Sequence, residues 1–190
     1  MMETLYCEGL QRRFCGKAFD SPTDSLLPGM KLGINHKTGQ NWSLTSWFTA
    51  SMPTPGAFTL EWIPDELQLV VKRRDVKYWT SGVLNNGTFK NLEILTDYNF
   101  TQVSNTDEES LTFKIVPNGL LYGPTDPDWV NVTSLSLEYD GTMVAQKSSG
   151  MFLTIYESCD GYNTNSGCGR WEGPKCRSHG EKFQKKTIGL

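Results

Sequence analysis

The sequence predicts an all-β protein of short antiparallel strands, and three observations support this. Apolar and polar residues alternate with a period of two in several runs, as in Phe58-Thr-Leu-Glu-Trp-Ile63. β-branched and aromatic residues, which favour strands, are enriched in these runs. Turn residues separate the runs at short intervals, and almost no segment has the period of a helix. This pattern is typical of a sandwich, barrel or prism.

The main strand array is expected over residues 57–158. Asp140-Gly141 joins two of its runs and predicts a two-residue type I′ hairpin, because both turn positions favour φ > 0. Asn118-Gly119 is interpreted in the same way. The clearest strand candidates, in chain order, are 58–63, 67–72, 76–80, 111–116, 129–139 and 151–156.

The remaining segments differ from this array in composition. Residues 1–17 belong to no pattern, and residues 18–50 hold a turn-rich segment that ends in short strands. The Pro/Gly-rich stretch Ser51–Gly56 is interpreted as a linker. Residues 159–190 form a Cys-, Gly- and Lys-rich tail with little aliphatic content of its own.

The charge balance excludes several classes of partner. The 190 residues carry 18 Lys plus Arg against 21 Asp plus Glu, a net charge of −3. Nucleic-acid binding needs a basic surplus, and so does adhesion to an anionic membrane surface. No apolar run approaches the roughly 20 residues that span a bilayer, so no membrane insertion is expected. The first 13 residues also lack the basic and apolar regions of a secretory signal.

Two features nevertheless favour the secretory pathway. The late cysteines Cys159, Cys168 and Cys176 lie in a Gly/Asn/Ser-rich stretch, where disulfides substitute for a missing core, so they are disulfide candidates with open connectivity. Four Asn-x-Ser/Thr sequons are N-glycosylation candidates. Their acceptors are Asn41, Asn86, Asn99 and Asn131.

No constellation of catalytic or metal-binding residues stands out. The two histidines, His36 and His179, have no nucleophile motif nearby and complete no zinc-binding spacing. No phosphate-binding glycine loop and no kinase catalytic motif occurs, so no cofactor is expected. Strand carboxylates such as Glu61 and Glu138 are interpreted as outer-face residues rather than a glycosidase pair. The run 72–75 (Lys-Arg-Arg-Asp) is interpreted as a charged strand end rather than an anion site.

Six tryptophans leave open a carbohydrate-binding alternative, because aromatic faces stack on sugar rings. Tryptophan at alternating strand positions is more often part of a core. The residues concerned are Trp42, Trp47, Trp62, Trp79, Trp129 and Trp171.

An ordered series of motifs resembles the ectodomain of the plant G-type, or bulb-type, lectin S-receptor-like serine/threonine kinases. Residues 18–33 resemble the end of the bulb-type lectin domain in that family. Tyr78-Trp-Thr-Ser-Gly82 and Asn86-Gly-Thr-Phe89 resemble its S-locus glycoprotein domain, and residues 167–183 resemble the start of its PAN/apple region. The matching positions of the first motif are Phe19, Asp20, Pro22, Thr23, Asp24, Leu26, Leu27, Pro28, Gly29 and Met30.

The resemblance implies a domain order and a setting. It implies the C-terminal remnant of an incomplete β-prism lectin domain at 18–50, an S-locus glycoprotein-like β domain at 57–158, and a PAN/apple-like start at 159–190. It also implies a location outside the cell or on the outer face of the plasma membrane. The mannose-binding motif Gln-x-Asp-x-Asn-x-Val-x-Tyr is absent from the chain, and so are the kinase motifs.

These features favour a non-catalytic recognition fragment that contacts a protein partner, such as a related receptor ectodomain, in pollen self-recognition or defence signalling. One alternative is a residual lectin that binds glycans through exposed tryptophans. Another alternative is that the chain is classed by descent as a receptor serine/threonine kinase, although the kinase domain is absent from it.

Overall fold

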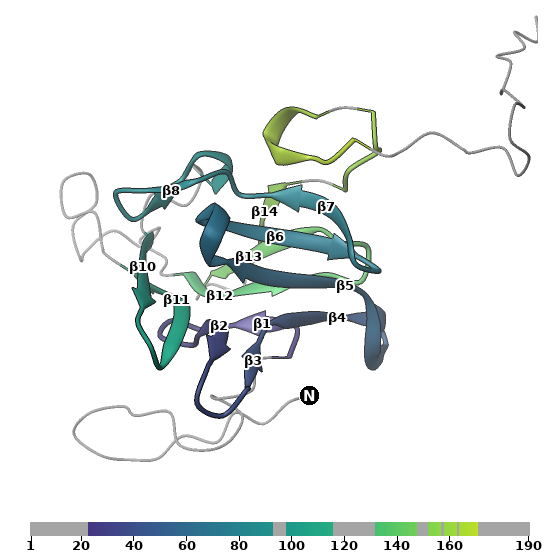
Figure 1. Cartoon of the computed structure of the whole chain (residues 1–190). Coiled ribbons are helices and arrows are strands. Elements are labelled where there is room, and N and C mark those ends of the chain that lie inside the picture. Colours follow the sequence, from purple (N-terminus) through teal and green to yellow (C-terminus); the bar gives the residue numbers. More distant parts are fainter. Residues whose placement is uncertain are drawn as a thin grey trace, which may run out of the picture.

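The computed structural model describes residues 23–92, 98–115, 132–147, 152–156, 158–162 and 164–170. The described part is all-β, as predicted, with small antiparallel sheets and three short 3₁₀ turns but no α-helix (Figure 1). Within it, no helix has the length and apolarity to cross a membrane.

The first sheet is a meander with the strand order β4-β5-β6-β7. Its alternating residues pair across the strands, for example Leu60 with Val71 and Trp62 with Leu69, so that large side chains stack on one face. A 3₁₀ turn at Pro64–Glu66 joins β5 to β6. The strands are β4 (Leu44–Thr49), β5 (Met52–Ile63), β6 (Gln68–Arg73) and β7 (Val76–Thr80).

The expected linker at residues 51–56 is wrong, because residues 52–56 form the first half of β5. Pro55 pairs with Trp47 of β4, but β6 pairs only with the second half of β5, from Phe58 to Ile63. One side of residues 52–57 therefore has no ladder from β6. Proline is tolerated at such an edge, since its missing N–H deprives no neighbour of a hydrogen bond.

The second sheet has the order β10-β11-β2-β3, and the third has the order β1-β12-β13-β14. The second contains β2 (Leu32–Asn35), β3 (Asn41–Trp42), β10 (Tyr98–Ser104) and β11 (Glu108–Ile115). The third contains β1 (Ser25–Leu26), β12 (Val132–Leu137), β13 (Met143–Lys147) and β14 (Phe152–Tyr156).

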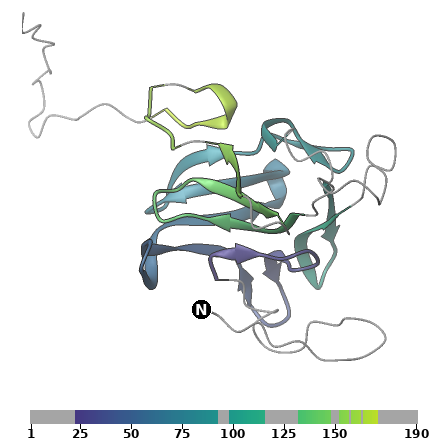
Figure 2. The same ribbon diagram turned by 180° about the vertical axis from the view of Figure 1, so that it is seen from behind.

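Residues 25–49 contribute strands to each of the three four-stranded sheets. β4 pairs with β5, β2 pairs with β11, and β1 pairs with β12. Seen from the front and from behind, these strands lie beside the strands from later in the chain (Figures 1 and 2). The edges of this segment are thus paired with strands from later in the chain.

One apolar core joins the three sheets. It includes Trp62 and Trp79 of the first sheet, Phe113 of the second, and Leu135 and Tyr156 of the third. The aromatic rings contact one another across the sheets, and the Trp79 and Tyr156 rings stack with centroids 4.3 Å apart.

The turn chemistry differs from prediction at one hairpin. Asp140-Gly141 lies in the loop between β12 and β13, but only Gly141 has a positive φ, of 87°. Gly141 N–H donates to the Glu138 carbonyl, and Glu138 N–H donates to the Thr142 carbonyl. Residues 139–141 therefore form a three-residue loop whose last residue is the left-handed glycine. The two-residue type I′ pattern occurs instead at Asn86-Gly87, with φ of 48° and 78°, between β8 (Leu84–Asn85) and β9 (Thr88–Phe89). The second predicted turn, Asn118-Gly119, lies outside the described residues.

Candidate functional site

A disulfide-closed loop covers the outer edge of β7. Cys159 and Cys168 form a disulfide across nine positions, so two of the three candidate cysteines pair with each other, while Cys176 lies outside the described residues. Cys168 forms a β-bridge with Trp79, and Gly169 N–H donates to the Tyr78 carbonyl at 2.8 Å. The loop thus supplies the hydrogen-bonding partner that the last strand of the first sheet otherwise lacks.

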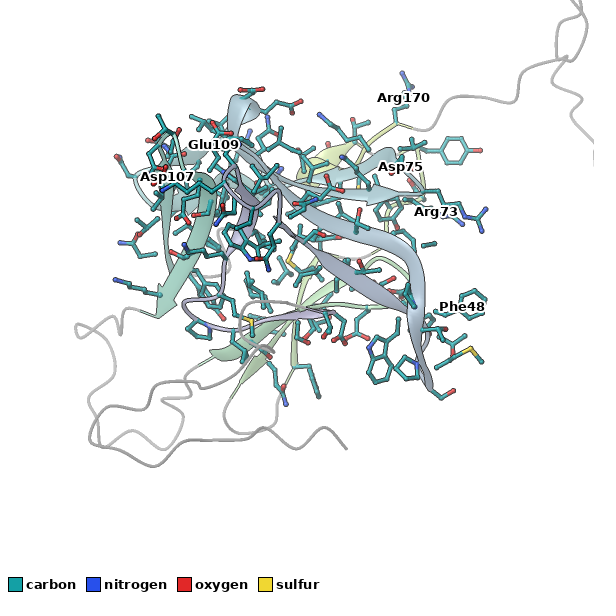
Figure 3. The ribbon with its side chains drawn as sticks, turned by 60° about the horizontal axis from the view of Figure 1, so that its bottom comes forward. Phe48, Arg73, Asp75, Asp107, Glu109 and Arg170 are labelled. Atoms are coloured by element: carbon teal, nitrogen blue, oxygen red, sulfur yellow. A yellow bond between two sulfur atoms is a disulfide. The ribbon has the colours of Figure 1, made fainter. Side chains whose placement is uncertain are left out.

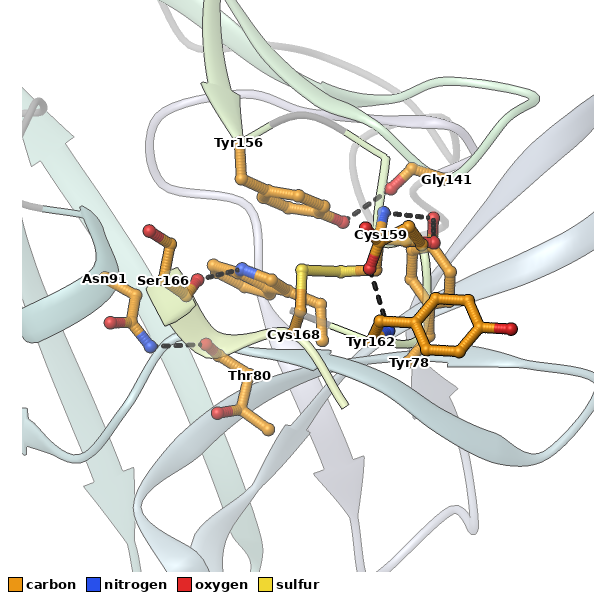
Figure 4. The surroundings of a disulfide bond; sticks show 11 residues. Tyr78, Thr80, Asn91, Gly141, Tyr156, Cys159, Tyr162, Ser166 and Cys168 are labelled. Carbon is orange, nitrogen blue, oxygen red and sulfur yellow. Dashed lines mark hydrogen bonds between the residues drawn. A yellow bond between two sulfur atoms is a disulfide. The ribbon is translucent and has the colours of Figure 1, made fainter. Parts of the chain in front are cut away.

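Trp79 connects this loop to the core. Its side chain is fully buried and stacks on Tyr156 at an interplanar angle of 10°. Its indole N–H donates to the Ser166 carbonyl at 2.7 Å (Figure 4). The buried indole N–H is therefore satisfied by the loop, and displacing the loop would leave that donor without its partner.

Two buried tyrosines secure the other end of the loop. Cys159 N–H donates to the Tyr78 hydroxyl at 2.7 Å, and the Tyr156 hydroxyl donates to the Gly141 carbonyl at 2.5 Å. Burial raises the pKa of Tyr78, and burial also raises the pKa of Tyr156 well above its usual value. Both hydroxyls therefore stay protonated at physiological pH.

The second half of the loop depends on a glycine. Gly167 has φ of 93°, and a Cβ there would lie 2.0 Å from the Thr80 carbonyl oxygen. The same oxygen accepts a hydrogen bond from the Asn91 side-chain amide at 2.8 Å. The close approach of the loop backbone to β7 thus requires a residue without a side chain.

A groove of about 480 Å³ lies between this loop and β14. Three consecutive residues at the end of β14 line it, Thr154, Ile155 and Tyr156. Its walls are mainly polar, and Asp160 is the one charged residue among those that line it. The loop contributes Ser158, Cys159, Asp160, Asn165, Ser166 and Cys168.

The predicted glycan acceptors lie away from this groove. Asn41 is exposed on β3, Asn86 is exposed in the β8–β9 turn, and Asn99 is exposed on β10. Their side chains are therefore accessible, as acceptors must be. Asn131 lies outside the described residues.

The tryptophans do not form an exposed platform. Trp42, Trp62 and Trp79 are buried, because their alternating positions point them into packed layers. Trp47 is half-buried, and Trp129 and Trp171 lie outside the described residues. The carbohydrate alternative that relied on exposed tryptophans is wrong for those three residues.

Most charged strand residues are engaged with one another. Lys72 donates to Glu61 at 2.6 Å, and Lys77 donates to Glu66 at 2.8 Å. Arg73 at the end of β6 and Asp75 in the β6–β7 turn lie at the surface (Figure 3). On β11, the Glu109 carboxylate lies 3.4 Å from the His36 Nε2 atom. Among the described residues, no group of His, Cys, Asp and Glu is placed to hold a metal ion.

The loop, the stacked rings and the groove were only partly accessible to sequence reasoning. The sequence predicts the cysteines as disulfide candidates, and the β-branched and aromatic residues of 151–156 predict the strand that ends at Tyr156. The contributions of Tyr78 and Gly167 depend on contacts between segments more than 80 residues apart. The one sequence signal that relates to them is the run FLTIY followed closely by Cys159.

Known proteins are similar to this chain over different parts of its length. A D-mannose binding lectin family matches residues 7–48. An S-locus-specific glycoprotein of Brassica oleracea is 31% identical over 160 residues, which is 78% of this chain and 34% of the relative. The chain is therefore a homologue of the G-type lectin S-receptor-like kinases and S-locus glycoproteins, as the motif series predicts.

Two kinases of Arabidopsis thaliana define how much of the family the chain represents. Both are G-type lectin S-receptor-like serine/threonine-protein kinases. One is 37% identical over 94 residues, covering 49% of this chain and 12% of the kinase. Another is 29% identical over 170 residues, covering 82% of this chain and 19% of the kinase. The chain thus spans about a third or less of the length of these three relatives, and it corresponds to their lectin and S-locus glycoprotein region.

Proposed function

We propose that this chain is a non-catalytic recognition module. In this proposal, residues 18–50 are the remnant of a β-prism lectin domain, residues 57–158 an S-locus glycoprotein-type domain, and residues 159–190 the start of a PAN/apple region. The module lies outside the cell or on the outer face of the plasma membrane. It binds a protein partner, such as a related receptor ectodomain, in pollen self-recognition or defence signalling.

The groove between β14 and the disulfide loop is the observation that carries this proposal. It is concave, it is lined by hydroxyl, amide and carboxylate groups, and a covalent bond and stacked aromatic rings hold its wall in place. A rigid wall lowers the entropy lost on binding, which favours recognition. The groove holds no histidine and no pair of carboxylates, so its described lining supplies no acid–base machinery.

The residual-lectin alternative has little support in the described residues. Stacking on a sugar needs an exposed aromatic face, and three tryptophans are enclosed. A glycan therefore stays the weaker candidate partner. Saturable binding on a glycan array, lost on Trp47→Ala, would revive it.

The proposal is tested by affinity capture from plant membranes, with the oxidised 190-residue chain as bait. We expect enrichment of a receptor-like ectodomain of the same family, identified by mass spectrometry, relative to a reduced and alkylated bait. Equal recovery on both baits would refute recognition by the folded module. The same preparation should transfer no label from ATP, and transfer by the purified chain would refute the non-catalytic assignment.

A further inference from the structure

The outer edges of β7 and β14 differ in how their backbone groups are satisfied. β7 is covered by Cys168 and Gly169 of the disulfide loop. β14 is the last strand of its sheet, and within the described residues only β13 pairs with its backbone. The register on β13 shifts at Ile155, so the regular part of this edge is residues 152–154. An exposed strand edge offers a row of N–H and C=O groups that another extended chain can pair with.

We propose that the outer edge of β14 binds an extended segment of the partner protein, which adds a fifth strand to the third sheet and places side chains in the groove. This inference rests on the proposed recognition function and names the chemistry of its partner. Addition of a strand to a sheet edge is a known mode of peptide recognition, in which backbone hydrogen bonds provide affinity and alternate side-chain contacts provide specificity.

The side chains of β14 define what the added segment must offer. Phe152 is 63% exposed and Thr154 is exposed, whereas Leu153 and Ile155 pack partly against the core. An added strand would therefore continue an apolar row beside Leu153 on its inner face. On its outer face it would cover the Phe152 ring. Apolar residues at alternate positions of the segment satisfy the first requirement. On the other face, a threonine or the aliphatic part of a lysine can cover the Phe152 ring.

Charge gives a further requirement. Asp160 is part of the groove wall, and no basic residue is among the described residues that line it. Asp140 is exposed in the turn whose Gly141 carbonyl accepts the Tyr156 hydroxyl. The one charged side chain among the described groove residues is thus a carboxylate, which complements a lysine or arginine in the partner segment.

The test uses the oxidised full chain, labelled with ¹⁵N, and the capped peptide Thr-Val-Lys-Val-Thr as probe. We expect millimolar peptide to shift the amide resonances of β14 and of residues 158–160, and to leave those of β3 and β10 unchanged. A peptide N-methylated at alternate amides should bind at least about tenfold more weakly, because it cannot pair along one edge. Asp160→Asn should weaken binding about two- to fivefold, as for an exposed ion pair.

A matched variant controls for loss of a surface apolar group. Val103 is exposed on β10, far from the groove in sequence and in sheet order, so Val103→Thr should leave the shifts unchanged. Phe152→Thr should reduce binding. Absence of shifts at millimolar peptide, shifts centred on another strand, or equal binding of the N-methylated peptide would each overturn the proposal. Concentration-dependent shifts of β14 without peptide would also overturn it, by assigning the edge to a second copy of the chain.

The two proposals fail separately. If a receptor ectodomain is captured from membranes but the capture is insensitive to Phe152→Thr, recognition stands and the β14 edge is not its site. If nothing is captured, the recognition function itself fails.

Discussion

β7 and β14 are terminal strands of two sheets that are joined by the stacked rings of Trp79 and Tyr156, but their outer edges differ in backbone pairing. The disulfide loop pairs with β7, whereas β14 has a groove beside it. A closed edge protects against unwanted pairing, and an open edge is retained where pairing has a use. The same loop thus pairs with the edge of one sheet and forms a wall of the groove beside the other.

Breaking the disulfide should have the largest effect on this comparison. Replacing Cys159 and Cys168 together by Ala removes a cross-link over nine positions, worth ~3 kcal/mol in chain entropy. The β7 edge should then become exposed as β14 is. Urea unfolding measures the loss. Tyr162→Ser in the same loop, where the ring is 87% exposed, should leave stability unchanged within error.

A smaller loss is expected from Gly167→Ala. The new methyl group would meet the Thr80 carbonyl oxygen and would occupy a left-handed backbone position. We expect a destabilisation of about 2 kcal/mol or more. Gly39→Ala is the matched control, since φ is also positive, at 71°, but nothing lies within 4 Å of its Cβ. It should cost only about 1 kcal/mol, and equal losses at both positions would show that the loop does not pack closely on β7.

The third prediction concerns the turn beneath the Tyr156 hydroxyl. Burial, followed by the charges of Asp140 and Asp24, raises the pKa of Glu138. The folded state thus holds this proton more tightly than the unfolded state, so stability falls as pH rises through the ordinary value towards the folded one. Glu138→Gln removes that penalty and should raise the melting temperature by about one to two degrees at pH 7. Below the ordinary glutamate pKa the two proteins should melt together, and a gain that persists there would contradict the assignment.

The smallest effect is expected from the glycan acceptors. Asn41 and Asn99 lie on β3 and β10, away from both compared edges. Chain passed through a eukaryotic secretory pathway should carry glycans at exposed sequons, which glycopeptide mass spectrometry detects. Asn41→Gln and Asn99→Gln should change neither partner capture nor the melting temperature by more than about one degree. Loss of capture would place the recognition surface on the second sheet instead.

Sequence reasoning gave the strands because their signal is local. Alternation within 58–63 predicts the second half of β5, and the β-branched and aromatic residues within 151–156 predict β14. The prediction of a linker at 51–56 is wrong, because the proline content of this stretch does not reveal which side of β5 is paired. The predicted two-residue type I′ turn at Asp140-Gly141 is wrong, because backbone hydrogen bonds of Glu138 close a three-residue loop instead.

The site was harder to predict because its parts meet only in the folded chain. Cysteine content predicted a disulfide, but the pairing of Cys159 with Cys168 depends on how the loop crosses β7. Tyr78 and Cys159 are 81 positions apart, and no spacing rule relates them. Whether a strand has an open edge depends on the order of strands in the sheet. The sequence of one strand does not contain that order.

Amide hydrogen exchange of the oxidised chain tests the difference between the two edges most directly. Gly169, whose N–H is bonded to β7, should be protected on the order of a hundredfold relative to an unstructured peptide. Amides of residues 152–154 that face away from β13, in the part of β14 before the register shift at Ile155, should exchange close to the unstructured rate. Uniform protection along β14 would contradict the account, because its edge would then already be paired and closed to a partner.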